Sequence, residues 1–277
     1  MAEPSAERAA KGLWWDKGWT LVEGCTPCSA GCKECWALAL EKRTGRAVEG
    51  GGIKLRPDRL EEPLHWRKPR VIAVWNDLFH PDVPFEFIAK AYATMQQTPQ
   101  HTYILLTKRP KRRNAFWAWV TEACLVWMKP VPPRLPNVIE AVTCESNEYL
   151  WRAEELVKTP AAVRFVNAHL LGPLWFGCSS VPWAGGEQAG GRDYQPTLNL
   201  IDWLAVECNR PFRGDPAEWW GWCKSLVEQA TAAGVKVWVK QGPLPSGRVT
   251  HDFADFPAWA RRREFPATAE KGADDER

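Results

Sequence analysis

The chain has 277 residues, of which 45% are hydrophobic, and a formal net charge of +3. This length and apolar content suffice for one large domain with a substantial core. No run of about 18 apolar residues occurs, which excludes a membrane-spanning helix. Residues 1–12 lack the apolar core of a signal peptide, so we expect a cytoplasmic protein.

The two ends of the chain are rich in small, polar and charged residues. We therefore expect disordered tails over residues 1–12 and 267–277. Between them we find neither a repeat of solenoid period nor a low-complexity linker. A single domain is expected over residues 13–266.

Four of the nine cysteines fall in the segment EGCTPCSAGCKECWA, at Cys25, Cys28, Cys32 and Cys35. Thiolates this close together repel one another unless a cation neutralises them, so the cluster indicates a metal site. The three residues between Cys28 and Cys32 are too few to wrap zinc from both sides. Compact cysteine runs are typical of iron–sulfur clusters, while zinc and unliganded thiols remain alternatives.

Two subsets of these cysteines fit a 4Fe–4S cluster that keeps one iron open. Cys28, Cys32 and Cys35 form C-x3-C-x2-C, whereas Cys25, Cys32 and Cys35 form C-x6-C-x2-C. If all four bound, the cluster would be closed and would only store or carry an electron. The remaining cysteines stand singly among apolar residues and are expected to be buried thiols, except Cys144 and Cys208, which lie near predicted strand ends.

Short β-branched runs alternate with helix-like segments through the middle of the chain. Strands are expected over residues 70–75, 102–107, 138–143, 162–167, 200–206 and 235–240. Apolar residues at helical spacing predict helices over 84–97, 114–126, 149–157 and 216–233. This alternation predicts an α/β fold of parallel strands, as a full or partial (β/α) barrel or an open doubly wound sheet.

Polar residues follow most of the predicted strands, where such folds place their chemistry. They are Asn76, Asp77 and His80; Lys108 and Arg109; Glu145, Ser146 and Asn147; Asn167 and His169; Glu207, Cys208 and Asn209; and Lys240 and Gln241. Any one of them is explained as a solvated loop residue. Their recurrence at successive strand ends predicts a shared site.

C-x3-C-x2-C spacing early in a chain of β/α units resembles the radical S-adenosylmethionine (SAM) superfamily. The segments GWTLVEGCTPCSAGCKECWA, NDLFHPDVPFEFI, TPQHTYILLTKRP, TPAAVRFVNAHLLGPL and AAGVKVWVKQG narrow this match. Together they resemble a family of phage- and prophage-encoded three-cysteine-motif proteins, regarded as radical-SAM-like. The resemblance runs from about residue 14 to 266, with a gap over the Gly-rich residues 176–197, a candidate lid or surface loop. It departs from the family at Ala168-His169-Leu170 and at residues 206–210.

The resemblance implies a radical-SAM-like (β/α) barrel that holds a 4Fe–4S cluster and SAM. A reduced cluster would cleave SAM to a 5′-deoxyadenosyl radical, with an electron donor such as flavodoxin or ferredoxin. The residues expected to bind the cofactor are Trp36, Asn76, Asp77, Glu145 and Asn147. The candidate catalytic residues are Lys108, Glu145, His169 and Lys240, and Lys108, Arg109 and Lys240 are also candidates for an anionic substrate.

The phage setting suggests a modified base in DNA or a nucleotide as the substrate. The basic runs 108–113 and 261–263 are candidate phosphate contacts, although charge runs are usually solvated faces. Some of the 18 tryptophans could stack on a base, and most must be packing material. The alternative function is a nucleic-acid-binding protein stabilised by zinc or a cluster, without SAM chemistry.

Overall fold

The computed structural model describes residues 1–130, 132, 134–177 and 197–266. The expected tail 267–277 and nearly all of the expected insertion 176–197 lie outside these residues. Within the described part, no helix has the length and apolar content needed to span a bilayer.

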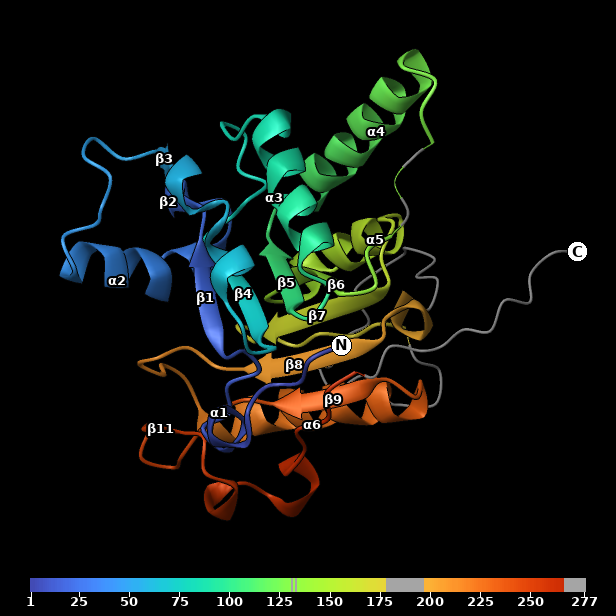
Figure 1. Cartoon of the computed structure of the whole chain (residues 1–277). Helices are drawn as coiled ribbons and strands as arrows, with labels where there is room; N and C mark the ends of the chain where they lie inside the picture. The colour runs from blue at the N-terminus through green and yellow to red at the C-terminus, as the bar shows by residue number, and fades with distance from the viewer. Residues whose placement is uncertain (131, 133, 178–196, 267–277) are drawn as a thin grey trace, which may run out of the picture.

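A seven-stranded sheet, parallel throughout, forms the centre of the molecule (Figure 1). Its strands lie in chain order: β1 (Lys17–Thr20), β4 (Val71–Trp75), β5 (Thr102–Thr107), β6 (Val138–Cys144), β7 (Val163–His169), β8 (Trp203–Glu207) and β9 (Lys236–Val239). Each crossover adds the next strand on the same side, whereas a doubly wound sheet reverses its order. The predicted α/β fold with parallel strands is confirmed, and this winding is compatible with a partial barrel.

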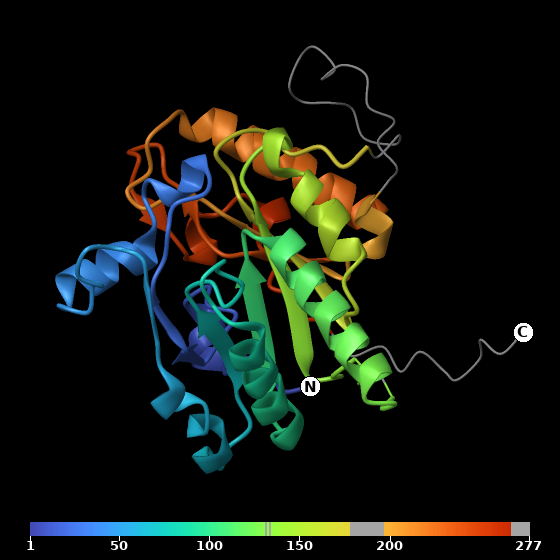
Figure 2. The same ribbon diagram turned by 90° about the horizontal axis from the view of Figure 1, so that it is seen from above.

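Four helices cover the outer face of the sheet, as Figures 1 and 2 show from two directions. They are α3 (Phe85–Gln97), α4 (Pro110–Val126), α5 (Trp151–Val157) and α6 (Pro216–Ala232). Their apolar sides pack on two clusters of mostly aliphatic residues from alternate strand positions. In α3, for example, Ile88, Ala91 and Met95 are fully buried at helical spacing.

Aromatic side chains cover part of the inner face of the sheet, beside smaller aliphatic residues. Phe165, Trp203 and Trp238 point there from three strands and pack with Trp14 in one buried cluster. The rings of Phe165 and Trp203 stack at 4.1 Å, and Trp14 meets both rings edge-on. We call these four residues the aromatic floor. Since Asn167 follows Phe165 by two positions on β7, the floor lies directly below the polar strand ends.

The expectation of a disordered tail over residues 1–12 is corrected by the structure. Residues 6–10 form the short helix α1 (Ala6–Ala10), and Gly12 packs against β9. The indole Nε1 of Trp238 donates to Gly12 O at 2.9 Å. A Cβ at Gly12, where φ is +74°, would overlap with Lys240 O, so this close approach needs glycine. The small residues of this segment allow it to pack closely against β9, whereas their composition alone had suggested disorder.

Smaller elements surround the carboxyl ends of the strands. The ribbon β2 (Val22–Gly24) with β3 (Ile53–Leu55) and the helix α2 (Trp36–Arg43) flank the cysteine segment. A second ribbon, β10 (Gly242–Pro243) with β11 (Val249–Thr250), follows β9. None of these elements, nor β1, was among the predicted strands and helices.

Candidate active site at the carboxyl ends of the strands

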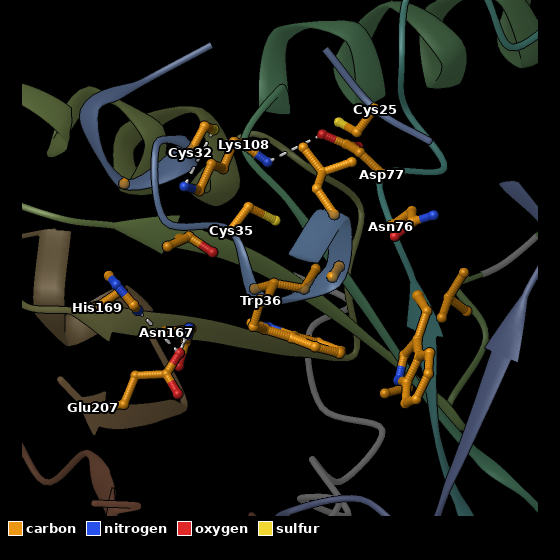
Figure 3. A pocket seen from close by; sticks show the side chains of 18 of the residues that line it. Cys25, Cys32, Cys35, Trp36, Asn76, Asp77, Lys108, Asn167, His169 and Glu207 are labelled. Atoms are coloured by element: carbon orange, nitrogen blue, oxygen red, sulfur yellow. Dashed lines mark hydrogen bonds and ion pairs between the residues drawn. The ribbon is translucent and has the colours of Figure 1, made fainter. Parts of the chain in front are cut away.

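A pocket opens at the carboxyl ends of the strands and encloses about 1100 Å³ free of protein atoms, including its opening to solvent. Figure 3 shows Cys32, Cys35 and Lys108 as one group and His169, Asn167 and Glu207 as another, with Trp36 below the cysteines in this view. Residues that follow five of the six predicted strands line this pocket, so these strand ends lie together around one opening.

All four clustered cysteines line the pocket. They lie on the segment from the end of β2 to the start of α2, and Cys32 ends a short 3₁₀ helix, Ala30–Cys32. All four thiols are free, and two sulfurs have cationic neighbours. Lys108 Nζ lies 3.5 Å from Cys32 Sγ, and Arg109 Nη1 lies 3.5 Å from Cys25 Sγ. This end of the pocket thus combines four thiols with the positive charge that stabilises thiolates.

A shared hydrogen bond separates the pKa values of Cys28 and Cys32. The hydrogen bond with Cys28, helped by Ser29 and Lys108, lowers the pKa of Cys32 to about 3. The same bond raises the pKa of Cys28, and burial raises the pKa of Cys25. Within the described part of the chain, no three Cys, His, Asp or Glu side chains already stand in a metal-binding arrangement.

Glu145 anchors the cysteine segment from below. Its side chain is fully buried and is not among the pocket-lining residues of the described chain. It accepts hydrogen bonds from Ser29 Oγ at 2.7 Å, from Arg152 at 3.2 Å and from Lys108. A Cβ at Gly31 would overlap with its Oε1. The structure therefore gives this residue, expected to touch SAM or substrate, a position behind the cysteines.

A second buried carboxylate, Glu41 on α2, holds the start of the segment. Its two oxygens each accept from Gly24 N at 3.1 Å, and Asn76 Nδ2 donates to it at 2.7 Å. Asn76 also donates to Val22 O, and its φ of +61° places it in the left-handed region. Sequence reasoning missed Glu41, because a glutamate beside Lys42 and Arg43 resembles an exposed helix residue. Its buried setting depends on partners distant in the chain.

Asp77 and Arg109 form an ion pair at 2.8 Å in the pocket wall. Thr107 Oγ1 donates to the same carboxylate at 2.7 Å, and Arg109 Nη2 donates to Thr26 O at 2.6 Å. Burial would lower the pKa of Arg109, but Asp77 outweighs burial and raises it. For Lys108 the same balance of burial against Glu145 raises the pKa. Both cations, expected to meet an anionic substrate, are thus neutralised by buried carboxylates.

Four residues from β7, β8 and the end of β9 form the opposite end of the pocket: Asn167, His169, Glu207 and Lys240. We call them the β7–β9 polar group. Glu207 is its centre: Asn167 Nδ2 donates to Oε1 at 2.8 Å, His169 Nδ1 lies 3.4 Å from Oε1, and Lys240 pairs with Oε2. Burial would raise the pKa of Glu207, but Lys240, His169 and Asn167 outweigh burial and lower it.

The remaining predicted residues divide between the wall and the exterior of the pocket. Trp36 lines the pocket, is 52% exposed and meets Trp75 edge-on at 5.3 Å. Asn147 lies elsewhere, where its Oδ1 accepts from Trp175 N at 2.9 Å. Cys144 and Cys208 are fully buried, and burial raises the pKa of each to about 12, so both stay neutral thiols.

The two basic runs make many internal contacts. Arg113 is fully buried beside Glu140, and Arg112 lies over the Phe85 ring. Arg262 pairs with Glu264 at 2.8 Å, and Arg263 donates to Ala10 O. Much of the positive charge that suggested phosphate contacts therefore holds the protein's own segments together.

The family model described as "Protein of unknown function (DUF5131)" matches residues 10–252. The chain belongs to the DUF5131 family. The matched range contains every residue that lines the pocket, from Trp14 to Lys240, so the whole candidate site falls within the part of the chain that the family model covers. No curated protein and no solved structure matches the chain.

Proposed function

We propose that this DUF5131 protein is a radical SAM enzyme whose cysteine segment holds a 4Fe–4S cluster. The observation that carries the proposal is the convergence of four free cysteines on one pocket at the carboxyl ends of a parallel sheet. The resemblance of the cysteine spacing and flanking segments to radical-SAM-like proteins supports the same assignment.

The residues present fit such a cluster by their chemistry. Iron–sulfur clusters are bound by thiolates, and Lys108 and Arg109 place positive charge beside two of the sulfurs. Cys25, Cys32 and Cys35, or Cys28, Cys32 and Cys35, would be the ligands. With SAM bound, the cluster would supply a 5′-deoxyadenosyl radical that takes a hydrogen atom from the substrate.

The protein's own residues would hold the reactants and exclude water. Glu145 and Glu41 fix the cysteine segment, and Trp14 of the aromatic floor lines the pocket. Trp36 and Trp75 supply an aromatic wall for the adenosine part of SAM or for the substrate. Lys240 and His169, at the far end, face the substrate side of the pocket.

We propose a nucleotide, or a modified base in DNA, as the substrate. A pocket lined by indole rings suits a planar heterocycle, because any nucleobase can stack on an indole through its flat face. Lys108 and Arg109 are already paired with Glu145 and Asp77. This favours recognition of the base over binding of phosphate groups by these two cations.

The test is anaerobic purification, iron–sulfide reconstitution and EPR of the dithionite-reduced protein with and without SAM. We expect a 4Fe–4S signal that shifts when SAM is added, together with release of 5′-deoxyadenosine. A signal indifferent to SAM would contradict an open iron, and stoichiometric zinc without iron would overturn the enzyme assignment.

Single substitutions identify the ligands. We expect Cys32→Ala and Cys35→Ala to abolish the cluster signal, while Cys124→Ala, on α4, leaves it unchanged. Of Cys25→Ala and Cys28→Ala, one is expected to retain the signal, which names the three-cysteine subset. Loss of the signal in both would indicate a closed four-cysteine site.

A further inference from the structure

The β7–β9 polar group contains a hydrogen-bond acceptor without a partner, on Asn167, and a donor with free N–H groups, on Lys240. Asn167 is 3% exposed and lines the pocket, yet among the described residues its Oδ1 has no hydrogen-bond partner. Buried side-chain oxygens are nearly always paired, so an unpaired one in a pocket wall points to a missing ligand donor.

The orientation of the Asn167 amide is fixed by its neighbour. The Glu207 carboxylate only accepts hydrogen bonds, so Nδ2 must face Glu207 Oε1, 2.8 Å away. Turning the amide over would set two oxygens against each other. The Asn167 amide oxygen is therefore an unpaired acceptor within the wall at this end of the pocket.

Lys240 supplies the complementary donor. Its ammonium has three N–H groups, and the interaction with Glu207 Oε2 uses one of them. Its side chain is 14% exposed, lines the pocket and lies over the Trp15 ring at 5.2 Å. Both oxygens of Glu207 already have partners, because Asn167 and His169 face one of them and Lys240 the other.

The walls around this acceptor and donor are aromatic. Trp14 and Trp15 line the pocket beside the polar group, and Trp36 and Trp75 line it towards the cysteines. A ligand at this end of the pocket would meet flat apolar surfaces and, beside them, one hydrogen-bond acceptor and one donor. This combination matches a heterocycle that carries an N–H donor next to an acceptor atom.

We propose that the β7–β9 polar group binds the hydrogen-bonding edge of the substrate nucleobase, with Asn167 Oδ1 accepting from a base N–H and Lys240 donating to the adjacent acceptor atom. The proposal rests on the proposed function and assigns the substrate, as distinct from SAM, to the end of the pocket opposite the cysteines. Asn167 and Lys240 thereby determine specificity.

Calorimetric titration of the reconstituted protein, with SAM present, tests the proposal. The probes are the four 2′-deoxynucleosides, each compared with a counterpart N-methylated to remove its edge N–H groups, such as N4,N4-dimethyl-2′-deoxycytidine. We expect at least one nucleoside to bind and its methylated counterpart to bind at least about tenfold more weakly, the loss expected for one unmade hydrogen bond in a buried site.

Substitutions assign the effect to the two residues. We expect Asn167→Leu and Lys240→Met each to weaken nucleoside binding at least about tenfold, and Lys240→Arg, which keeps N–H donors and the positive charge, to weaken it less. The matched control is Asn199→Leu, at an exposed position, with unchanged binding. The EPR signal and the SAM-induced shift are expected to persist in each variant and to verify its fold.

Two results overturn the proposal. One is the failure of all four nucleosides to bind the wild-type protein. The other is an Asn167→Leu or Lys240→Met protein that loses affinity for SAM but keeps affinity for the nucleoside. Absence of a cluster would instead defeat the proposed function alone, since nucleoside binding is measurable without it.

Discussion

The two ends of the pocket are built by different means. The cysteine end is a loop, and buried carboxylates outside the pocket wall hold it in place, Glu145 from β6 and Glu41 from α2. The β7–β9 polar group stands on and beside strands whose backbone is already fixed by the sheet. A site on a loop depends on buried residues that hold the loop in place without contacting the ligand. A site at strand ends is instead positioned by the backbone hydrogen bonds of the sheet.

The largest effect is expected from a substitution that removes the support of the cysteine end of the pocket. Glu145→Ala leaves Arg152 buried without its carboxylate partner, and we expect a loss of about 3–5 kcal/mol in the free energy of unfolding. Denaturant unfolding measures the loss, and iron content after reconstitution reports the cysteine segment. Glu154→Ala, an exposed position on α5, is the control. Equal stability of the two variants would refute the anchoring role.

The second prediction concerns the strand end. Glu207→Gln removes the charge that pairs with Lys240, at an expected cost of about 1.5–3 kcal/mol at pH 7. The folded pKa of Glu207 lies below its ordinary value of 4.5, so its contribution is complete above that value. The contribution is lost as pH falls through the lowered folded pKa. Unfolding free energies at several pH values should therefore converge for variant and wild type in acid.

The third prediction probes the fit between loop and anchor. A Cβ at Gly31 overlaps with Glu145, so Gly31→Ala is expected to cost about 1–3 kcal/mol and to reduce bound iron. Gly221→Ala is a matched control, because that glycine lies within α6 and a Cβ there meets nothing within 4 Å. The control is expected to gain about 0.5–1 kcal/mol. Thermal unfolding distinguishes the opposite signs.

The smallest effect is expected for Glu41→Gln. The amide keeps the shape and one acceptor oxygen but cannot accept with both, so about 1 kcal/mol is expected to be lost. Hydrogen exchange at the Gly24 amide should accelerate, while exchange in β7 and β8 stays unchanged. Acceleration in those strands as well would show that the two ends of the pocket are not independent.

Sequence reasoning predicted the strand end of the site better than the loop end. A six-residue β-branched run predicted β5, and the polar residues after β4 to β9 do gather at one edge of the sheet. The strand β1 was not predicted, because Lys17 and Gly18 interrupt its apolar pattern. Gly18 is needed there, since a Cβ would overlap with the Trp75 ring.

What each polar residue does at that edge depends on partners distant in the chain. Glu145 and Glu207 have the same strand-end signature, yet one is buried behind the cysteines and the other lines the pocket. Ser29, 116 residues away in sequence, is what distinguishes Glu145. No local pattern carries that information, and composition misjudged residues 1–12 for the same reason.

The aromatic floor also sets an order for folding during synthesis. Gly12 meets Trp238 across 226 positions of sequence, and Ala10 meets Arg263 across 253. The ribosome delivers the N-terminal segment first, so Trp14 has to wait for Trp203, and Gly12 for β9, to be synthesised. Contacts this distant close late, because chain entropy opposes them until most of the protein is ordered. The base of the pocket is thus completed last, after the strands that surround it.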